Sequence, residues 1–140
     1  MFISYNKVRM NDTDVAGVLY FANQFRFVHD AWEDLVELEN MSFSQIFYNE
    51  DFLFVIVHVE ANYLAPLMIA DKLEVTVVAE NIGTSSFTMN YKIYKEDGAT
   101  KELTLTGTAK TTHVTIDKLK RTKVAIPDHL KAILQKYTSN

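Results

Sequence analysis

The chain has 140 residues, of which 48% are hydrophobic and 23% charged, and this composition predicts one globular domain with a substantial core. It contains no cysteine, which excludes disulfides, thiolate nucleophiles and cysteine-based metal sites. Its formal net charge of −4 gives no general attraction to nucleic acid or to anionic lipid, so we expect no nucleic-acid partner.

The first segment, Phe2 to Met10, is β-branched enough to predict a strand that ends in the turn Asn11-Asp12-Thr13-Asp14. The start of the sequence lacks the basic segment and the apolar run of a signal peptide. No run reaches the roughly 18 apolar residues that a membrane-spanning helix needs. We therefore expect a cytoplasmic protein without a membrane span.

A long helix is predicted next, from Phe21 to Leu38. At about 100° per residue, its apolar side chains fill an arc of roughly 220°, with Trp32 at the centre. An arc this wide indicates that neighbours contact the helix on several sides. We therefore expect Trp32 in the core and a curved sheet around the helix.

After a short helical turn over Ser42–Tyr48, four segments are rich in Val, Ile, Thr, Tyr and Phe, which predicts strands. The turn residues between them favour antiparallel hairpins. Pro127-Asp128 then begins a last helix. The four predicted strands are Phe52–Leu64, Asp71–Ile82, Ser85–Tyr94 and Thr100–Ile116.

The order of these elements predicts a single α+β domain over residues 1–140, in which an antiparallel sheet wraps around a long central helix. This order matches the hotdog fold. Disorder is expected only in the tail Thr138-Ser139-Asn140.

Asp12 and Asp14 precede the long helix and are the first candidates for chemistry. A helix N-terminus offers unpaired backbone N–H groups and a partial positive charge that can hold an oxyanion. A nearby carboxylate can attack an acyl group or deprotonate water. The alternative interpretation is that either aspartate only caps the helix or closes a turn.

The segment from Asp12 to Phe21, read as D-T-D-V-A-G-V-L-Y-F and followed by Asn23, carries a family resemblance. It resembles the signature of hotdog-fold acyl-CoA thioesterases of the 4-hydroxybenzoyl-CoA thioesterase type, and the resemblance extends over nearly the whole chain. Further features agree in order and spacing, namely Val59–Pro66, Asp71–Val75, Ser86-Phe87 and Thr112-His113-Val114.

The resemblance implies hydrolysis of a CoA thioester, with release of coenzyme A and a carboxylate. Asp14 matches the catalytic carboxylate of the family and would act as nucleophile or as general base. Backbone N–H groups near Tyr20 and Phe21 would polarise the thioester carbonyl, and Gly17 would let the backbone approach the acyl group. No cofactor is implied, because coenzyme A is part of the substrate, and no histidine spacing indicates a metal site.

Two segments resemble a narrower group, the 1,4-dihydroxy-2-naphthoyl-CoA thioesterases of menaquinone and phylloquinone biosynthesis. They are His29–Glu33 in the predicted helix and Ile56-Val57-His58 in the next strand. The resemblance implies an aromatic acyl group, with Ser86 and His58 as substrate contacts and His58 facing a ring hydroxyl. His29 and His58 are also open to interpretation as hydrogen-bonded structural residues, and His113 and His129 give weaker indications.

The chain departs from some aryl-CoA relatives at Gly83-Thr84-Ser85, where those relatives carry basic residues. The candidates for contacts with the coenzyme A phosphates are therefore Lys120 and Arg121, in the basic cluster from Lys118 to Lys123. The alternative interpretation is that this basic cluster is only a solvent-exposed loop.

Other functions remain open at this stage. A general short- or medium-chain acyl-CoA thioesterase and a noncatalytic acyl-CoA-binding protein both fit the sequence. A dehydratase is disfavoured because His29 and Asp30 are adjacent and so lie on different faces of the helix. We expect a homodimer or homotetramer, because one hotdog domain leaves a sheet edge open and sites of this family form where two protomers meet.

Overall fold

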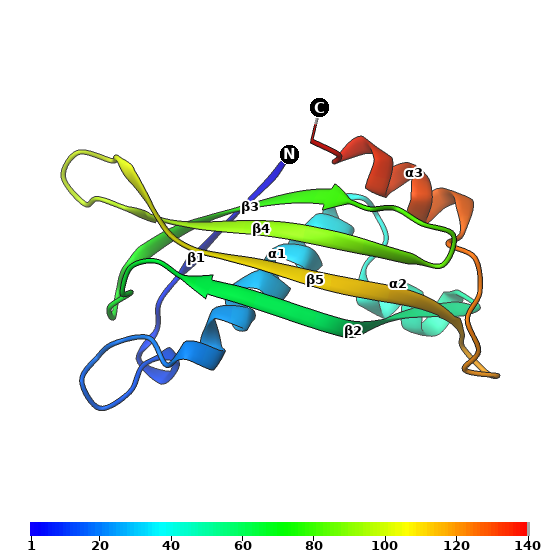
Figure 1. Cartoon of the computed structure of the whole chain (residues 1–140), viewed down its shortest axis with the longest axis horizontal. Helices are drawn as coiled ribbons and strands as arrows, with labels where there is room; N and C mark the ends of the chain where they lie inside the picture. The colour runs from blue at the N-terminus through cyan, green and yellow to red at the C-terminus, as the bar shows by residue number, and fades with distance from the viewer. Residues whose placement is uncertain (140) are drawn as a thin grey trace.

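A five-stranded antiparallel sheet curls around one long helix in this computed structural model, which describes residues 1–139 (Figure 1). The strands lie in the spatial order β1-β3-β4-β5-β2. The predicted α+β hotdog architecture is confirmed. In chain order, the elements are β1 (Phe2–Lys7), 3₁₀ turns at Met10–Asp12 and Phe21–Asn23, α1 (Gln24–Leu38), α2 (Phe43–Asn49), β2 (Phe52–Tyr63), β3 (Lys72–Glu80), β4 (Ser86–Glu96), β5 (Leu103–Asp117) and α3 (Asp128–Lys136).

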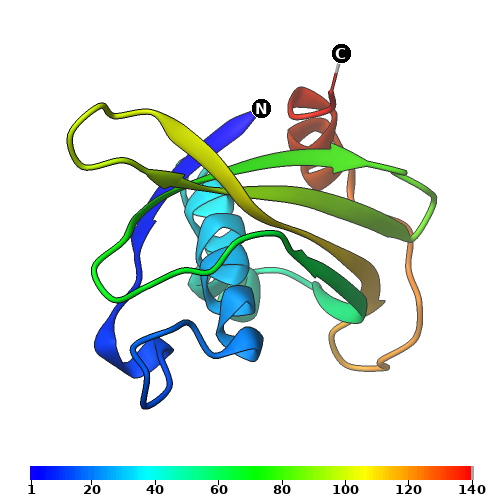
Figure 2. The same ribbon diagram turned by 60° about the vertical axis from the view of Figure 1, so that its left-hand side comes forward.

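Helix α1 lies in the concave face of the sheet (Figure 2). Its buried side chains include Phe27, Trp32 and Leu35, and they pack against the inward-facing positions of the strands. Strands β3 and β4 alternate between buried and more exposed residues, as one-sided burial requires. The prediction of a helix contacted on several sides is confirmed, and Trp32 lies in the core. No helix within residues 1–139 is long and apolar enough to cross a membrane.

Several predicted boundaries shift. Strand β1 ends at Lys7 instead of Met10, because Met10–Asp12 form a 3₁₀ turn. Helix α1 begins at Gln24 instead of Phe21, because Phe21–Asn23 form a second turn of this kind, closed by the N–H of Asn23 donating to the carbonyl of Tyr20 at 2.9 Å.

The turn between β4 and β5 lies later in the chain than the sequence predicted. Glu96 pairs with Leu103, so β4 extends beyond Tyr94 and β5 starts later than Thr100. The carboxylate of Asp97 accepts two N–H groups within the turn, at 2.8 and 2.9 Å, which replaces the missing strand pairing.

Strand β2 is one edge of the sheet and pairs only with β5. A register shift between Ile56 and His58 marks a bulge at this edge. Three valines, Val55, Val57 and Val59, are exposed there. An open apolar edge is a surface on which another strand can pair.

The last helix, α3, buries Leu130 and Leu134, as its spacing predicted. The expected disorder of the tail is not observed at Thr138, which forms a parallel bridge with Ala79. Asn140, which belongs to the same prediction, lies outside the described residues.

Candidate active site

Asp14 lies in an exposed loop that is closed by a bridge between Thr13 and Leu19. One carboxylate oxygen, Oδ1, accepts the N–H groups of Ala16 at 2.8 Å and Val18 at 3.4 Å. The other oxygen has no hydrogen-bond partner among residues 1–139. The turn therefore fixes the direction of the carboxylate and leaves one oxygen open to a substrate or to water.

Gly17 has a φ of +77°, in the left-handed region that favours glycine. A Cβ atom at this position would meet only the Cδ1 of Ile69, at an ordinary contact distance of 3.7 Å. The need for glycine here is therefore conformational. Gly17 shapes the turn that holds Asp14, and the close approach of the acyl group that the resemblance implies stays a prediction.

The start of the helical segment provides free N–H donors, but Tyr20 is not one of them. Its N–H donates to the carbonyl of Asp12 at 2.9 Å. The N–H groups of Phe21 and Ala22 precede the first hydrogen bond of the 3₁₀ turn and have no acceptor within the described chain. Phe21 remains a candidate donor, Tyr20 does not, and Ala22 is the donor that sequence reasoning missed.

A cleft of about 360 Å³ lies beside Phe21. Phe21, Gln24 and Tyr63 line it, together with Leu64 and Pro66 after β2. The hydroxyl of Tyr63 donates to the carbonyl of Phe21 at 2.8 Å, and partial burial raises the pKa of this phenol. Tyr63 therefore stays protonated at neutral pH and ties the helical turn to the end of β2.

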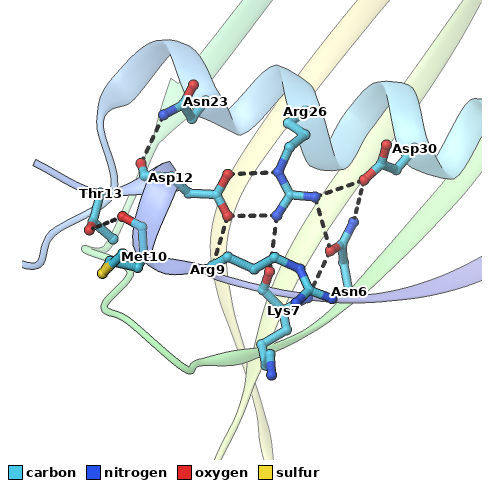
Figure 3. A network of polar contacts seen from close by, with 9 residues as sticks. All are labelled: Asn6, Lys7, Arg9, Met10, Asp12, Thr13, Asn23, Arg26 and Asp30. Atoms are coloured by element: carbon cyan, nitrogen blue, oxygen red, sulfur yellow. Dashed lines mark hydrogen bonds and ion pairs between the residues drawn. The ribbon is translucent and has the colours of Figure 1, made fainter.

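Asp12 has a different environment, shown in Figure 3, and its side chain is only 2% exposed. Arg26 donates to both carboxylate oxygens, from Nε and from Nη2, each at 2.6 Å. The N–H of Arg9 donates to the same carboxylate at 2.7 Å. The hydrogen bonds from Arg26 hold the pKa of Asp12 below its usual value, so the carboxylate is charged and has a structural role.

The same arginine connects three segments of the chain (Figure 3). Its Nη1 donates to Asp30 at 2.9 Å, and Asn6 on β1 donates to the same carboxylate at 2.9 Å. The side-chain amide of Asn23 donates to the carbonyl of Asp12, also at 2.9 Å. These bonds hold the loop, strand β1 and helix α1 together next to the turn of Asp14.

The predicted substrate contacts lie elsewhere. The side chain of His58 is 65% exposed on the edge strand β2, with its Nε2 4.0 Å from the carboxylate of Glu60. Ser86 is half-buried at the start of β4. Lys120 and Arg121 are exposed in the loop after β5, where their N–H groups donate to Asp117 at 2.8 and 2.9 Å.

The length of strand β2 separates the cleft beside Phe21 from the basic loop of Lys120 and Arg121. At its end, Tyr63 bonds to Phe21, and just before its start the carbonyl of Asp51 accepts the N–H of Lys118 at 2.8 Å. Phe52 and Tyr63 are eleven residues apart, which corresponds to about 36 Å of strand. One chain by itself therefore does not bring the basic loop to the cleft.

His113, to which sequence reasoning gave little weight, is 1% exposed on β5 and packs against Trp32. The sequence around it, Thr111-Thr112-His113-Val114-Thr115, has no alternation of polar and apolar residues, so only the tertiary structure reveals its burial.

Comparisons with known proteins agree with this architecture. A 1,4-dihydroxy-2-naphthoyl-CoA hydrolase of Nostoc punctiforme is 34% identical over 131 residues, which cover 93% of this chain and 84% of that protein. The enzyme of the same name from Thermosynechococcus vestitus is 36% identical over 128 residues, or 91% of this chain and 84% of that protein.

Among solved structures, a 1,4-dihydroxy-2-naphthoyl-CoA thioesterase from Synechocystis superimposes with a TM-score of 0.83 at 28% identity, covering 96% of this chain and 95% of that one. Residues 8–134 match the family described as the thioesterase-like superfamily. The chain belongs to this superfamily.

Proposed function

We propose that this protein hydrolyses aromatic acyl-CoA thioesters and that its substrate is 1,4-dihydroxy-2-naphthoyl-CoA. The observation that carries the proposal is the open carboxylate of Asp14, which two N–H groups hold in the loop that leads into a helical turn with free donors at Phe21 and Ala22. The relatives named above share this architecture, and their names supply the acyl group.

In the proposed reaction, the thioester carbonyl oxygen accepts the N–H groups of Phe21 and Ala22. As charge develops on that oxygen, these donors stabilise it, and loss of one such donor costs other hydrolases about 2.7–4 kcal/mol. Asp14 either removes a proton from the attacking water or attacks the carbonyl itself to form an anhydride that water then cleaves. In both routes the C–S bond breaks, coenzyme A leaves as the thiol and the acyl group leaves as a carboxylate.

The proposed active unit is a dimer formed through β2. Antiparallel pairing of two β2 edges covers the exposed Val55, Val57 and Val59 and satisfies the open backbone groups. Because the two strands run in opposite directions, the basic loop of a second copy approaches the cleft of the first. Lys120 and Arg121 of that copy then meet the coenzyme A phosphates, which the length of β2, about 36 Å, prevents within one chain.

The activity is tested by following thiol release from a panel of CoA esters. We expect a higher kcat/KM for 1,4-dihydroxy-2-naphthoyl-CoA than for palmitoyl-CoA or short aliphatic esters, and a turnover about 10²–10⁴-fold lower in the Asp14→Asn variant. A preference for aliphatic chains would indicate a general acyl-CoA thioesterase. Binding of the esters without thiol release would indicate a noncatalytic acyl-CoA-binding protein.

The shared site is tested by mixing two impaired variants, Asp14→Asn and the double variant Lys120→Ala/Arg121→Ala, under conditions that exchange subunits. A mixed dimer has one site with both defects and one intact site, so random exchange restores about a quarter of the wild-type sites. If each chain contained a whole site, mixing would restore none.

The interface is tested with a lysine on the open edge. Val57→Lys should give a monomer with little activity, because the charge cannot be buried between two β2 strands. Ile3→Lys places the same charge on β1, the other edge of the sheet, and should leave the dimer intact. Light scattering and thiol release at the same protein concentration compare the two variants.

A further inference from the structure

A second cavity lies between the middle of α1, α2, β2 and β5, and its volume is about 250 Å³. His29 and Trp32 of α1, Phe43 of α2, Ile56 of β2 and His113 of β5 line it. A smaller cavity of about 110 Å³ shares His29, Trp32, Ile56 and His113 with it. We call the two together the aromatic cavity.

The aromatic cavity is separate from the cleft beside Phe21. Trp32 follows Phe21 by eleven residues, which corresponds to about 16 Å along a helix. A thioester held by the N–H of Phe21 therefore does not extend a small ring to Trp32 of the same chain.

The walls of the aromatic cavity are flat. The ring centroid of Trp32 lies 5.2 Å from that of His113 and 5.4 Å from that of Phe54. His113 stacks on Phe87 at 4.8 Å with an interplanar angle of 6°, and His29 stacks on Phe43 at 5.5 Å. Faces and edges of this kind favour contact with another aromatic ring.

Two buried polar atoms of residues that line the aromatic cavity lack a hydrogen-bond partner among residues 1–139, namely Nε1 of Trp32 and Nδ1 of His113. Each residue is 1% exposed, and each lines both parts of the aromatic cavity. Buried indole N–H groups normally have an acceptor, and the face of an aromatic ring is only a weak one. The two atoms therefore point to a polar ligand group.

The other nitrogen of His113 fixes its ring. Nε2 lies 2.8 Å from the hydroxyl of Thr111, which is in turn 3.2 Å from the hydroxyl of Tyr91. Burial lowers the pKa of His113 to about 4, so the imidazole is neutral at pH 7. The described lining contains no Asp, Glu, Lys or Arg. The surroundings therefore suit a neutral polar group and not an ion.

We propose that the aromatic cavity binds a neutral hydroxylated aromatic ring, whose hydroxyl oxygen accepts the N–H of Trp32 while the same hydroxyl forms a hydrogen bond with Nδ1 of His113. A hydroxyl has one donor and two acceptor positions, so a single group satisfies both atoms. An apolar cavity of about 150 Å³ is known to hold benzene, so 250 Å³ accommodates one or two rings.

This site goes beyond the proposed thioesterase activity, and its ligand can have two sources. One source is a free hydroxyarene, and the other is the hydroxylated acyl ring of a CoA thioester bound at the site of a second copy. Both present the same chemistry to Trp32 and His113. Binding of a free arene tests the site itself, and kinetics then separate the two sources.

Trp32 is the only tryptophan in the chain, so the protein has a single indole N–H resonance to report on the cavity. We expect 1-naphthol to shift this resonance downfield in a saturable titration and to bind at least tenfold more tightly than naphthalene. An unchanged resonance, or equal affinity for the two arenes, overturns the proposal.

Variants measured by calorimetry at pH 7 locate the hydroxyl. His113→Phe keeps an aromatic ring and removes Nδ1, so it should abolish the preference for 1-naphthol over naphthalene. His129→Phe, a matched change on α3 outside the cavity, should retain the preference. If His58→Phe abolished it and His113→Phe did not, the proposed site would be wrong. The wild-type comparison of the two arenes decides the proposal even where a variant fails to fold.

Thioester kinetics in the presence of 1-naphthol then identify the source of the ring. A rise in KM at constant kcat assigns the cavity to the acyl ring of the substrate, whereas unchanged kinetics at saturating 1-naphthol assign it to a free hydroxyarene. Protein that binds 1-naphthol through Trp32 but releases no thiol from any CoA ester contradicts the proposed thioesterase function alone.

Discussion

Asp12 and Asp14 lie two residues apart, but their surroundings differ in almost every respect. Asp12 is buried, and three donor groups of Arg26 and Arg9 bind its carboxylate at 2.6 to 2.7 Å. Asp14 is exposed, and only the N–H groups of its own turn contact it. The comparison shows that a strong charge partner makes a carboxylate structural, whereas backbone donors orient a carboxylate and leave it free to react.

The backbone of Asp12 also contacts the end of the loop that carries Asp14. The carbonyl of Asp12 accepts the N–H of Tyr20, so the backbone of the residue that Arg26 holds also anchors Tyr20, at which the loop of Asp14 returns to the helix. Asp12 therefore supports the geometry of the candidate site.

The largest effect is expected for Asp14→Asn. The amide keeps the shape and the hydrogen bonds of Oδ1 but loses charge and basicity, so turnover should fall by about 10²–10⁴-fold, and the melting temperature should change little. Steady-state thiol release and thermal unfolding of the same preparation measure both quantities. A lower melting temperature with nearly normal turnover would restore the interpretation of Asp14 as a turn residue.

Asp12→Asn should lower stability and change turnover far less. It removes the charge that Arg26 requires, and it should lower the free energy of unfolding by about 1.5–3 kcal/mol, the usual contribution of a hydrogen bond to a charged group. Turnover at a temperature where the variant is folded should change far less than in Asp14→Asn. Urea unfolding and thiol release provide the test, and equal losses of activity in the two variants would contradict the comparison.

Gly17→Ala should have a smaller effect on stability than Asp12→Asn. At a φ of +77° a Cβ atom is strained, which costs about 1–2 kcal/mol, although the space around it is open. Because this turn orients Asp14, turnover should fall as well. Gly98→Ala, in the distant β4–β5 hairpin at a glycine without positive φ and with open space, is the matched control and should change neither quantity.

The smallest effect concerns pH. The pKa of Asp12 is lowered in the folded protein, so its contribution to stability is complete above its unfolded pKa of about 3.9 and is lost as pH falls towards the folded value. The difference in unfolding free energy between wild type and Asp12→Asn should therefore be constant above about pH 5 and should shrink below pH 4. If this difference in unfolding free energy increased as the pH fell, the prediction would be wrong.

The sequence predicted the elements well because their patterns are local. The wide apolar arc of α1 follows from side-chain spacing alone, and the predicted contact of this helix on several sides is confirmed. The end of β1 was predicted at Met10 and the start of α1 at Phe21, and both boundaries were wrong. Each error arises from a 3₁₀ turn, whose hydrogen bonds leave no distinct pattern in the sequence.

The site was predicted less completely. The motif singled out Asp14, Gly17 and Phe21, and the structure gathers all three around one loop, but Tyr20 has its N–H occupied by Asp12. Histidines were the hardest residues to assign. His58 is exposed at an edge and His113 is buried, although both are flanked by β-branched residues in strands.

The sequence by itself determined the fold class, the order of the elements and the family, because periodic burial and a contiguous motif are properties of neighbouring residues. Only the tertiary structure decided which aspartate Arg26 binds, which N–H groups stay free and which histidine is buried beside Trp32. Those outcomes depend on contacts between residues far apart in the chain, such as Trp32 and His113, and no local pattern encodes such a contact.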